Sequence, residues 1–211
     1  MNVVDKTNKG NKVTGIPQLS DRTNVTFEGE DLELVIGKNV KFLGVNFKLV
    51  GRNSKIIIED GVVLRGNFTV SDGSLIKIGS KSIFNWNADF WAIEGASVIV
   101  GSDCLFSRVF IKTSDGHSIF DRFTGERINF AQDVKIGNHV WLAQDAVILK
   151  GSVIGSGSVI GMGAVVSSEI EEHSIAVGVP AKVIRRNIDW DTSKLDVSPY
   201  PKLDRYDSPF T

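Results

Sequence analysis

Apolar residues recur at every sixth position between residues 134 and 167, a stretch that reads VKIGNHVWLAQDAVILKGSVIGSGSVIGMGAVVS. The positions are Ile136, Leu142, Ile148, Ile154, Ile160 and Val166, and four residues after the first five come Val140, Ala146, Ser152, Ser158 and Ala164. A period of six fits neither a helix nor a simple alternating strand, and it is typical of a parallel β-helix. Three hexads make one triangular coil, and we expect coils to stack at the strand spacing of roughly 4.8 Å.

The same phase continues upstream in a less regular form. Apolar anchors stand at Ile36, Ile58, Ile78 and Val100, and each is followed six residues later by Phe42, Leu64, Phe84 or Phe106. The anchor spacings of 22, 20 and 22 residues predict one coil of three hexads plus a small bulge. We therefore expect the β-helix to occupy residues 26–186, after a polar N-terminal segment at 1–25.

Two segments interrupt or follow the repeat. From Phe106 to Ile136 the chain runs 30 residues, twelve more than one coil, which predicts an inserted loop at about 112–130. Insertions into solenoids gather on one side and often build the binding site. Residues 187–211 form a non-repeat tail that we expect to pack on its own prism or on a neighbouring subunit, because it contains the aromatic residues Trp190, Tyr200, Tyr206 and Phe210.

Composition narrows the class of protein without identifying a reaction. The 211 residues include 24 basic and 25 acidic side chains, and the net charge of −1 argues against a nucleic-acid partner. The chain has neither a secretory leader nor an apolar stretch long enough to cross a bilayer, so we expect a cytoplasmic protein without membrane insertion. The single cysteine, Cys104, stands at a small-residue position of a hexad and is expected in the core.

Several motifs together resemble one known family. They are the hexads, the loop Thr113-Ser114-Asp115-Gly116-His117, the segment from Ile136 to Leu142, and the closing stretch from Val177 to Arg185. This chain resembles the hexapeptide-repeat acyltransferases, which are left-handed β-helix enzymes that work as trimers with acetyl-CoA. The loop, continued through residues 118–129, and the spacing of 24 residues between His117 and Trp141 are similar to the branch that O-acetylates capsular polysialic acid. Handedness rests on this resemblance alone, since right-handed crossovers are the general rule.

The resemblance implies a role for His117 as the general base. Acetyl transfer to a hydroxyl requires a base for the acceptor and then an acid for the departing thiol, and one imidazole can serve as both near neutral pH. Asp115 either holds the tautomer of this ring or caps the turn, and both alternatives stay open. The alternative is that His117 is a solvent-exposed loop histidine without a catalytic role. His139 and His173 are expected to be surface residues.

Aromatic residues outside the core are the second group of candidates. Trp141 lies between inward-facing Val140 and Leu142, so it should project from the prism, either into the site or into a subunit interface. The resemblance implies that Trp141 supports the thioester or the acceptor. Trp86 and Trp91 flank Phe84 and Phe90, which take inward positions, so both tryptophans should face outward. There they could stack on sugar rings of the acceptor, with Asn85 beside them, although packing between subunits is the favoured alternative for the two tryptophans.

The resemblance further implies a groove for CoA along the C-terminal coils. Its expected contacts are Trp141, Ala143, Gly161, Met162, Ser167, Ser168, Lys182 and Arg185. The basic residues would hold the phosphates of CoA, or they form a solvated terminus. Two positions depart from the family pattern, which often has Thr-Lys-Asp at Ser167-Ser168-Glu169 and Gly at Ala143.

Three classes of function remain to be compared. The first is O-acetylation of a polysaccharide by a homotrimer with sites between subunits, and the same fold also serves small acceptors such as monosaccharides, serine or nucleotide sugars. The second is a zinc hydratase with three histidine ligands, which the histidine spacings of 22 and 34 residues disfavour, so we expect no metal. The third is a non-catalytic scaffold. We adopt the first.

Overall fold

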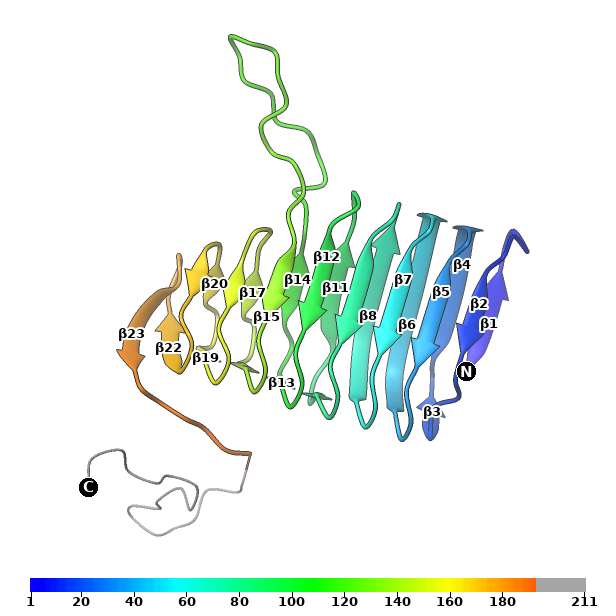
Figure 1. Cartoon of the computed structure of the whole chain (residues 1–211), viewed down its shortest axis with the longest axis horizontal. Helices are drawn as coiled ribbons and strands as arrows, with labels where there is room; N and C mark the ends of the chain where they lie inside the picture. Colours follow the sequence, from blue (N-terminus) through cyan, green and yellow to red (C-terminus); the bar gives the residue numbers. More distant parts are fainter. Residues whose placement is uncertain (193–211) are drawn as a thin grey trace.

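The chain folds into one long three-sided prism of β-strands (Figure 1). The structure is a computed structural model that describes residues 1–192, and within them the regular elements are all β-strands. In chain order they are β1 (Asn2–Asp5), β2 (Lys12–Thr14), β3 (Leu19–Asp21), β4 (Asn24–Glu30), β5 (Glu33–Ile36), β6 (Lys41–Arg52), β7 (Lys55–Ile58), β8 (Val63–Ser71), β9 (Leu75–Ile78), β10 (Ile83–Phe84), β11 (Ala88–Ala92), β12 (Ser97–Val100), β13 (Leu105–Phe106), β14 (Phe110–Lys112), β15 (Val134–Ile136), β16 (Trp141–Leu142), β17 (Val147–Ile148), β18 (Val153–Ile154), β19 (Val159–Ile160), β20 (Val165–Val166), β21 (Glu169–Ile170), β22 (Ser174–Val177) and β23 (Lys182–Arg186).

The strands pair in parallel along three faces of the prism, while β23 folds back antiparallel on β22. Face I is the eight-stranded sheet β2-β5-β7-β9-β12-β15-β18-β21. Face II is built from β3, the first parts of β6 and β8, and then β10, β13, β16, β19 and β22. Face III is built from β1, β4, the second parts of β6 and β8, and then β11, β14, β17 and β20.

The hexads predicted from the sequence align as expected. On face I, Ile36 pairs with Ile58, Ile58 with Ile78, and Ile78 with Val100, and the column continues to Ile136 and Ile154. All six apolar positions between residues 136 and 166 are buried, as are the five small or apolar residues four positions after the first five of them. A parallel β-helix is therefore confirmed, and each anchor stacks in the predicted register.

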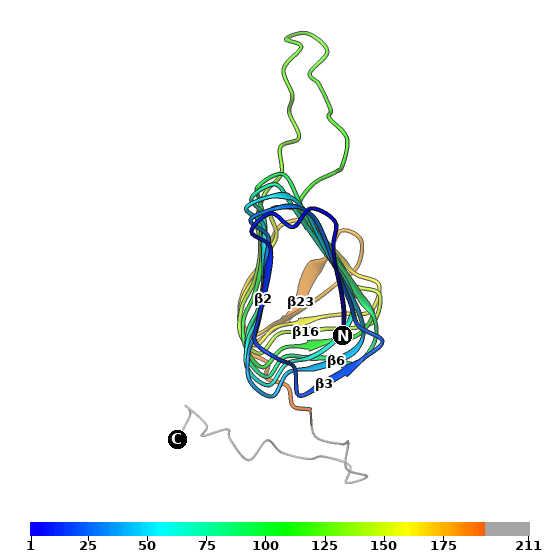
Figure 2. The same cartoon turned by 90° about the vertical axis from the view of Figure 1, so that its right-hand side faces the viewer.

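The β-helix is left-handed. Figure 2 views the prism from its N-terminal end, where the chain rises along β1, descends along β2 and crosses the base along β3. This path runs anticlockwise as the chain recedes from the viewer, which defines a left-handed coil. The handedness implied by the family resemblance is thus confirmed, and it departs from the right-handed crossover of most parallel sheets.

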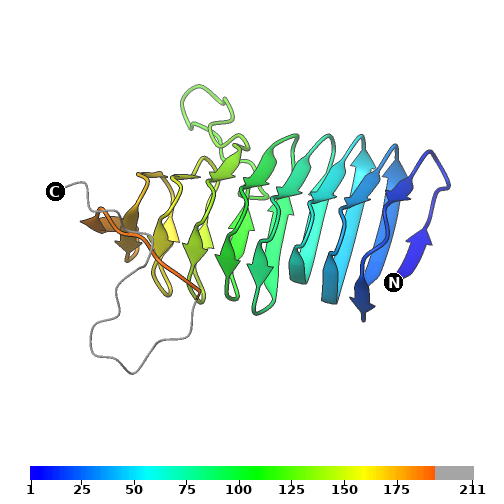
Figure 3. The ribbon, with the colours of Figure 1, turned by 60° about the horizontal axis from the view of Figure 1, so that its bottom comes forward.

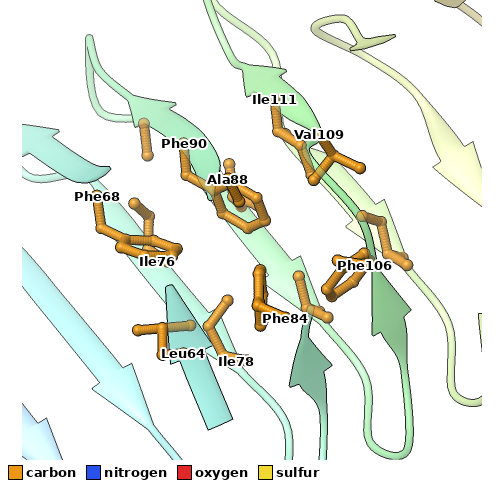
Figure 4. Close-up of a cluster of buried hydrophobic side chains, with 14 of the residues drawn as sticks. Leu64, Phe68, Ile76, Ile78, Phe84, Ala88, Phe90, Phe106, Val109 and Ile111 are labelled. Atoms are coloured by element: carbon orange, nitrogen blue, oxygen red, sulfur yellow. The ribbon is translucent and has the colours of Figure 1, made fainter. Parts of the chain in front are cut away.

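The core of the N-terminal and central coils is aromatic. Figure 4 shows Phe68, Phe84, Phe90 and Phe106 filling the interior together with aliphatic side chains from the same coils. Phe84 and Phe106 have ring centroids 4.6 Å apart, and Phe68 and Phe90 are 5.1 Å apart. Aromatic rings at such separations add attraction beyond their buried area, so this stack anchors the half of the prism that precedes the inserted loop.

The N-terminal boundary differs from the expected one. Residues 1–25, expected to form a polar segment before the helix, contain β1, β2 and β3, and these pair with β4, β5 and β6. The segment therefore forms the first coil of the helix. Its side chains contribute little to the core, and even Val3, Val4 and Leu19 stay 43–46% exposed although their backbones are paired.

Two segments lie outside the regular coils of the prism. The loop between β14 and β15, residues 113–133, projects from the corner between faces III and I as a long arm (Figures 1 and 3). At the C-terminus, residues 187–192 run back over the prism, and Trp190 packs there against its own chain. Tyr200, Tyr206 and Phe210 of the aromatic tail lie outside the described residues.

Candidate active site

The arm carries His117 on a backbone that hydrogen bonds hold in place. Near its tip, the Asp121 N–H donates to the Glu126 carbonyl at 2.8 Å, and the Ile128 N–H donates to the Ile119 carbonyl at 2.9 Å. The Asp121 carboxylate accepts from the backbone N–H groups of Phe123 and Thr124 at 2.8 Å each, and these bonds lower its pKa. The arm is therefore a folded hairpin-like loop.

Asn129 is the central residue at the root of the arm. Its side chain is buried, and its oxygen accepts from the Ile119 N–H at 2.7 Å. Its amide nitrogen donates to the Asp115 carboxylate and to the His117 carbonyl, both at 2.8 Å. One buried amide thus fixes the backbone immediately around His117, and its loss would leave several polar groups without a partner.

Charged residues of the prism tie the arm down. Lys150 donates to the Asp115 carboxylate at 2.5 Å and to the Asn129 carbonyl at 3.3 Å. Glu94 accepts from Ser114 and from Arg127, both at 2.7 Å. Lys150 and then Asn129 hold the pKa of Asp115 below its usual range, and Ser114 and then Arg127 do the same for Glu94.

These contacts bear on the two roles considered for Asp115. Within residues 1–192 the imidazole of His117 has no hydrogen-bond partner, and Asp115 is engaged with Lys150 and Asn129 instead. In this arrangement Asp115 helps to hold the loop, while the His117 ring is exposed and free to meet a partner from outside its own chain. Asn129, Lys150 and Glu94 were not singled out from the sequence, since only the arm's fold brings them together.

Trp141 lies on a different side of the prism from His117. It begins β16 on face II, between Leu105 of β13 and Val159 of β19, and it is 37% exposed as its outward position predicts. Figure 2 shows β16 in the base and the arm leaving the opposite corner. A single chain therefore does not bring these two residues together.

The expected CoA contacts divide among three places. Ala143 and Gly161 stack one coil apart where face II turns into face III, and exposed Met162 follows them. Ser167 and Ser168 lie at the corner between faces III and I, the corner from which the arm projects. Lys182 and Arg185 are exposed on β23, beyond the end of face II. All of these residues are at least partly exposed. Face III of the C-terminal coils lies between the group at Ala143 and Gly161 and the group at Ser167 and Ser168.

The expected acceptor contacts also fall in two places. Asn85 and Trp86 are exposed at the corner between faces II and III, whereas Trp91 lies on face III. Trp91 borders a hollow of about 430 Å³ that Asn46, Asn67 and Thr69 also line. The Trp91 carbonyl accepts from the Thr113 N–H at 3.0 Å, so this hollow adjoins the root of the arm.

The cysteine and the two other histidines have structural explanations. Cys104 is buried in the core, and burial raises the pKa of its thiol to about 11. His139 and His173 lie at the corner between faces I and II, where both adopt positive φ angles and contact residues 188–190. His139 is half-buried beneath Trp190, which differs from the expected surface position, while His173 is exposed. Among residues 1–192, no group of three or more His, Cys, Asp or Glu is arranged to hold a metal ion.

Residues 1–192 contain no helix that is long and apolar enough to cross a membrane.

Comparisons with known proteins agree with this architecture. Residues 133–168 match the model of the bacterial transferase hexapeptide family, described as six repeats. A polysialic acid O-acetyltransferase of Neisseria meningitidis is 39% identical over 176 residues, which cover 82% of this chain and 81% of that protein. A polysialic acid O-acetyltransferase of Escherichia coli O1:K1 is 41% identical over 143 residues, which cover 67% of this chain but only 43% of the longer E. coli protein.

Solved structures give the same result. The polysialic acid O-acetyltransferase OatWY superposes with a TM-score of 0.85 at 29% identity, over 93% of this chain and 92% of that one. A galactoside acetyltransferase in complex with coenzyme A has a TM-score of 0.52 at 27% identity, over 66% of this chain and 72% of that one. On its fold and its relatives, this chain belongs to the hexapeptide-repeat acetyltransferases, an acyltransferase family.

Proposed function

We propose that this protein is an acetyl-CoA-dependent O-acetyltransferase that modifies a hydroxyl of a bacterial surface polysaccharide, specifically the sialic-acid polymer of a capsule. The observation that carries this proposal is the relationship to two polysialic acid O-acetyltransferases, one of which is 39% identical over 82% of this chain. The superposition on the polysialic acid O-acetyltransferase OatWY across 93% of the chain is consistent with this relationship.

His117 is the proposed general base. Its imidazole accepts the proton of the acceptor hydroxyl while the oxygen attacks the thioester carbonyl, which forms a C–O bond and a tetrahedral oxyanion. When the C–S bond breaks, the imidazolium returns the proton to the departing thiolate of CoA. The arm supports this role because it holds the His117 backbone through Asn129 and leaves the ring accessible.

CoA is the proposed donor carrier. One structural neighbour that contains coenzyme A is a galactoside acetyltransferase of the same repeat fold. At the corner between faces II and III, Ala143 adds only a methyl group beside the backbone, which leaves room there for an extended chain, whereas the Val177 side chain fills the space beside Gly161. Lys182 and Arg185 supply positive charge at the end of face II for phosphate groups.

We propose that three copies assemble and that each site lies between two of them. His117 and Trp141 are on opposite sides of one prism, so a site that uses both requires residues from two chains. The arm also exposes five large apolar side chains, Ile119, Phe120, Phe123, Ile128 and Phe130, each more than half exposed. A neighbouring copy that covers them would remove this surface from water.

The test is turnover of acetyl-CoA, detected as free thiol, across a panel of acceptors with wild-type protein and His117→Ala in parallel. The panel contains sialic-acid polymers, neutral polysaccharides, galactosides and serine. We expect turnover on the sialic-acid polymer that collapses in the variant, and a trimeric mass by sedimentation. Turnover on galactosides alone would favour the second candidate, a small-saccharide acetyltransferase, which the galactoside acetyltransferase neighbour supports.

No turnover on any acceptor, together with no CoA binding by calorimetry, would contradict the enzyme assignment. A monomeric mass at micromolar concentration would contradict sites shared between subunits. We further propose that the protein acts in the cytoplasm, where acetyl-CoA is available, and fractionation of cells that express it tests this separately.

A further inference from the structure

The segment that follows β23 is attached to the prism through two histidines that the proposed reaction does not use. The Ile188 N–H donates to the His173 carbonyl at 3.0 Å, and Nδ1 of His173 lies 3.2 Å from the Ile188 carbonyl oxygen. Gly157 occupies the corner between the His139 and His173 coils, and a Cβ atom there would come within 2.5 Å of Nδ1 of His173. The lack of a side chain at Gly157 therefore leaves room for this contact.

His139 and Trp190 form a reciprocal pair. The indole Nε1–H of Trp190 donates to the His139 carbonyl at 2.9 Å, and the imidazole Nε2–H of His139 donates to the Trp190 carbonyl at the same distance. The two rings are stacked with centroids 4.1 Å apart and planes within 6°. Trp190 is only 7% exposed, so this residue, 51 positions along the chain from His139, is an anchor of the tail.

The same indole also contacts the side chain proposed for the site. The Trp141 and Trp190 rings are 5.9 Å apart with an interplanar angle of 45°. Trp141 is on an open face of the prism, and its strand neighbours, Leu105 and Val159, are aliphatic. Trp190 is therefore the aromatic neighbour that restricts the orientation of the Trp141 side chain.

We infer that Trp190 is a positioning residue for acetyl transfer, which fixes the Trp141 indole through its stacking on His139. The inference rests on the proposed function in one respect, namely that Trp141 faces the thioester or the acceptor. In a preorganised site, a side chain that must be oriented during each turnover slows the reaction more than it weakens binding. Loss of Trp190 should therefore lower kcat while the Kd for CoA changes little.

The experiment compares Trp190→Ala, Trp190→Phe and Ile188→Ala in the full chain. The Phe variant keeps a ring on His139 and beside Trp141 but loses the indole N–H bond. The matched control, Ile188→Ala, alters the same tail while its backbone bonds to His173 remain. For each protein, kcat, KM, the Kd for CoA by calorimetry and the thermal unfolding midpoint are measured.

We expect Trp190→Ala to lower kcat about tenfold while the Kd for CoA changes less than about threefold, the effect of mispositioning one side chain. Trp190→Phe should recover most of kcat, and Ile188→Ala should behave as wild type. Unchanged kcat in Trp190→Ala overturns the inference. A loss that follows the unfolding midpoint, or that Ile188→Ala shares in full, assigns Trp190 a purely structural role and overturns it as well.

A spectroscopic measurement separates this inference from the proposed function. Two indoles this close couple their electronic transitions, so the far-ultraviolet circular dichroism of the wild type should contain a couplet. The couplet should disappear equally in Trp141→Phe and Trp190→Phe. If the couplet is present but no acceptor is turned over, the proposed function fails and the Trp141–Trp190 geometry stands. If the two variants do not share the loss, the geometry itself is wrong.

Discussion

The prism and the arm are held together by different kinds of contact. The prism buries its apolar positions in continuous columns, so that each coil is held by the coils before and after it. The arm buries little of its apolar surface and depends on a few polar contacts centred on Asn129. The stability of this protein therefore resides in the repeat, whereas its proposed chemistry is carried by the segment that interrupts the repeat.

The largest expected effect comes from the arm. His117→Ala should lower kcat by about 10²–10⁴, the usual contribution of a general base. The unfolding midpoint should stay the same, because the His117 ring has no hydrogen-bond partner within residues 1–192. Turnover assays and thermal unfolding measure the two quantities. A variant with nearly full activity would show that the arm does not carry the base.

Substitutions in the core of the prism should lower the stability of the protein. Phe84→Ala removes a fully buried ring and should lower the free energy of unfolding by about 3–5 kcal/mol. The matched variant in the arm, Arg122→Ala, removes an exposed side chain and should change the free energy of unfolding by less than about 0.5 kcal/mol. Urea unfolding at one fixed protein concentration checks both, and equal losses would contradict the division between prism and arm.

Asn129→Ala removes the buried side chain on which the hydrogen bonds of the arm centre. The unpaired groups left behind cost about 1–3 kcal/mol locally, and we expect kcat to fall roughly tenfold as His117 loses its fixed backbone. Glu126→Ala is the control on the same arm, since its exposed side chain can be removed while its backbone bonds remain. Hydrogen exchange of residues 113–133 should rise only in the first variant.

The pH dependence of the arm follows from Asp115. Lys150, followed by Asn129, lowers the pKa of this carboxyl, so its stabilising contribution is complete above the ordinary aspartate pKa of about 3.9. The contribution is lost as pH falls through the lowered folded-state value. In Lys150→Met the pKa of Asp115 should rise, so that the arm loosens at a higher pH. Carboxyl NMR titration and exchange measurements at pH 3–6 would test this, and identical profiles would refute it.

The smallest effect concerns Cys104. Burial raises the pKa of this thiol to about 11, so it should not react with a thiol reagent in the native protein near pH 8. Reaction should appear only on unfolding, at the rate at which the prism opens. Rapid native labelling would mean that the core between β12 and β13 is accessible.

The sequence determined the prism in unusual detail because its period repeats. Ile36, Ile58, Ile78 and Val100 were predicted to stack from their spacing alone, and they do so in register. The coil at residues 1–25 was missed because its exposed valines and leucine carry no inward apolar signal.

The arm and the tail could be predicted only in part because they lie outside the repeat. Their position followed from the interrupted period, but their contacts join residues with no periodic relation, such as Asn129 to Asp115 or Trp190 to His139. The outward position of Trp141 followed from its place between two inward residues and is confirmed. The roles that the family resemblance implies for His117 and Trp141 stay predictions, as does the expected site between subunits.

The final strand has a consequence for solubility. Parallel β-helices end in open strand edges, which can template the addition of further chains. Here β23 turns back antiparallel on β22, and the Ala181 N–H bonds to the Val165 carbonyl at 2.8 Å on the neighbouring face. Because β23 runs opposite to the other strands, a further coil could not continue the parallel pairing on its edge. The exposed side chains of Lys182, Arg185 and Arg186 also place positive charge along that edge. Within residues 1–192, the C-terminal edge of face II is thereby protected against the addition of further parallel strands.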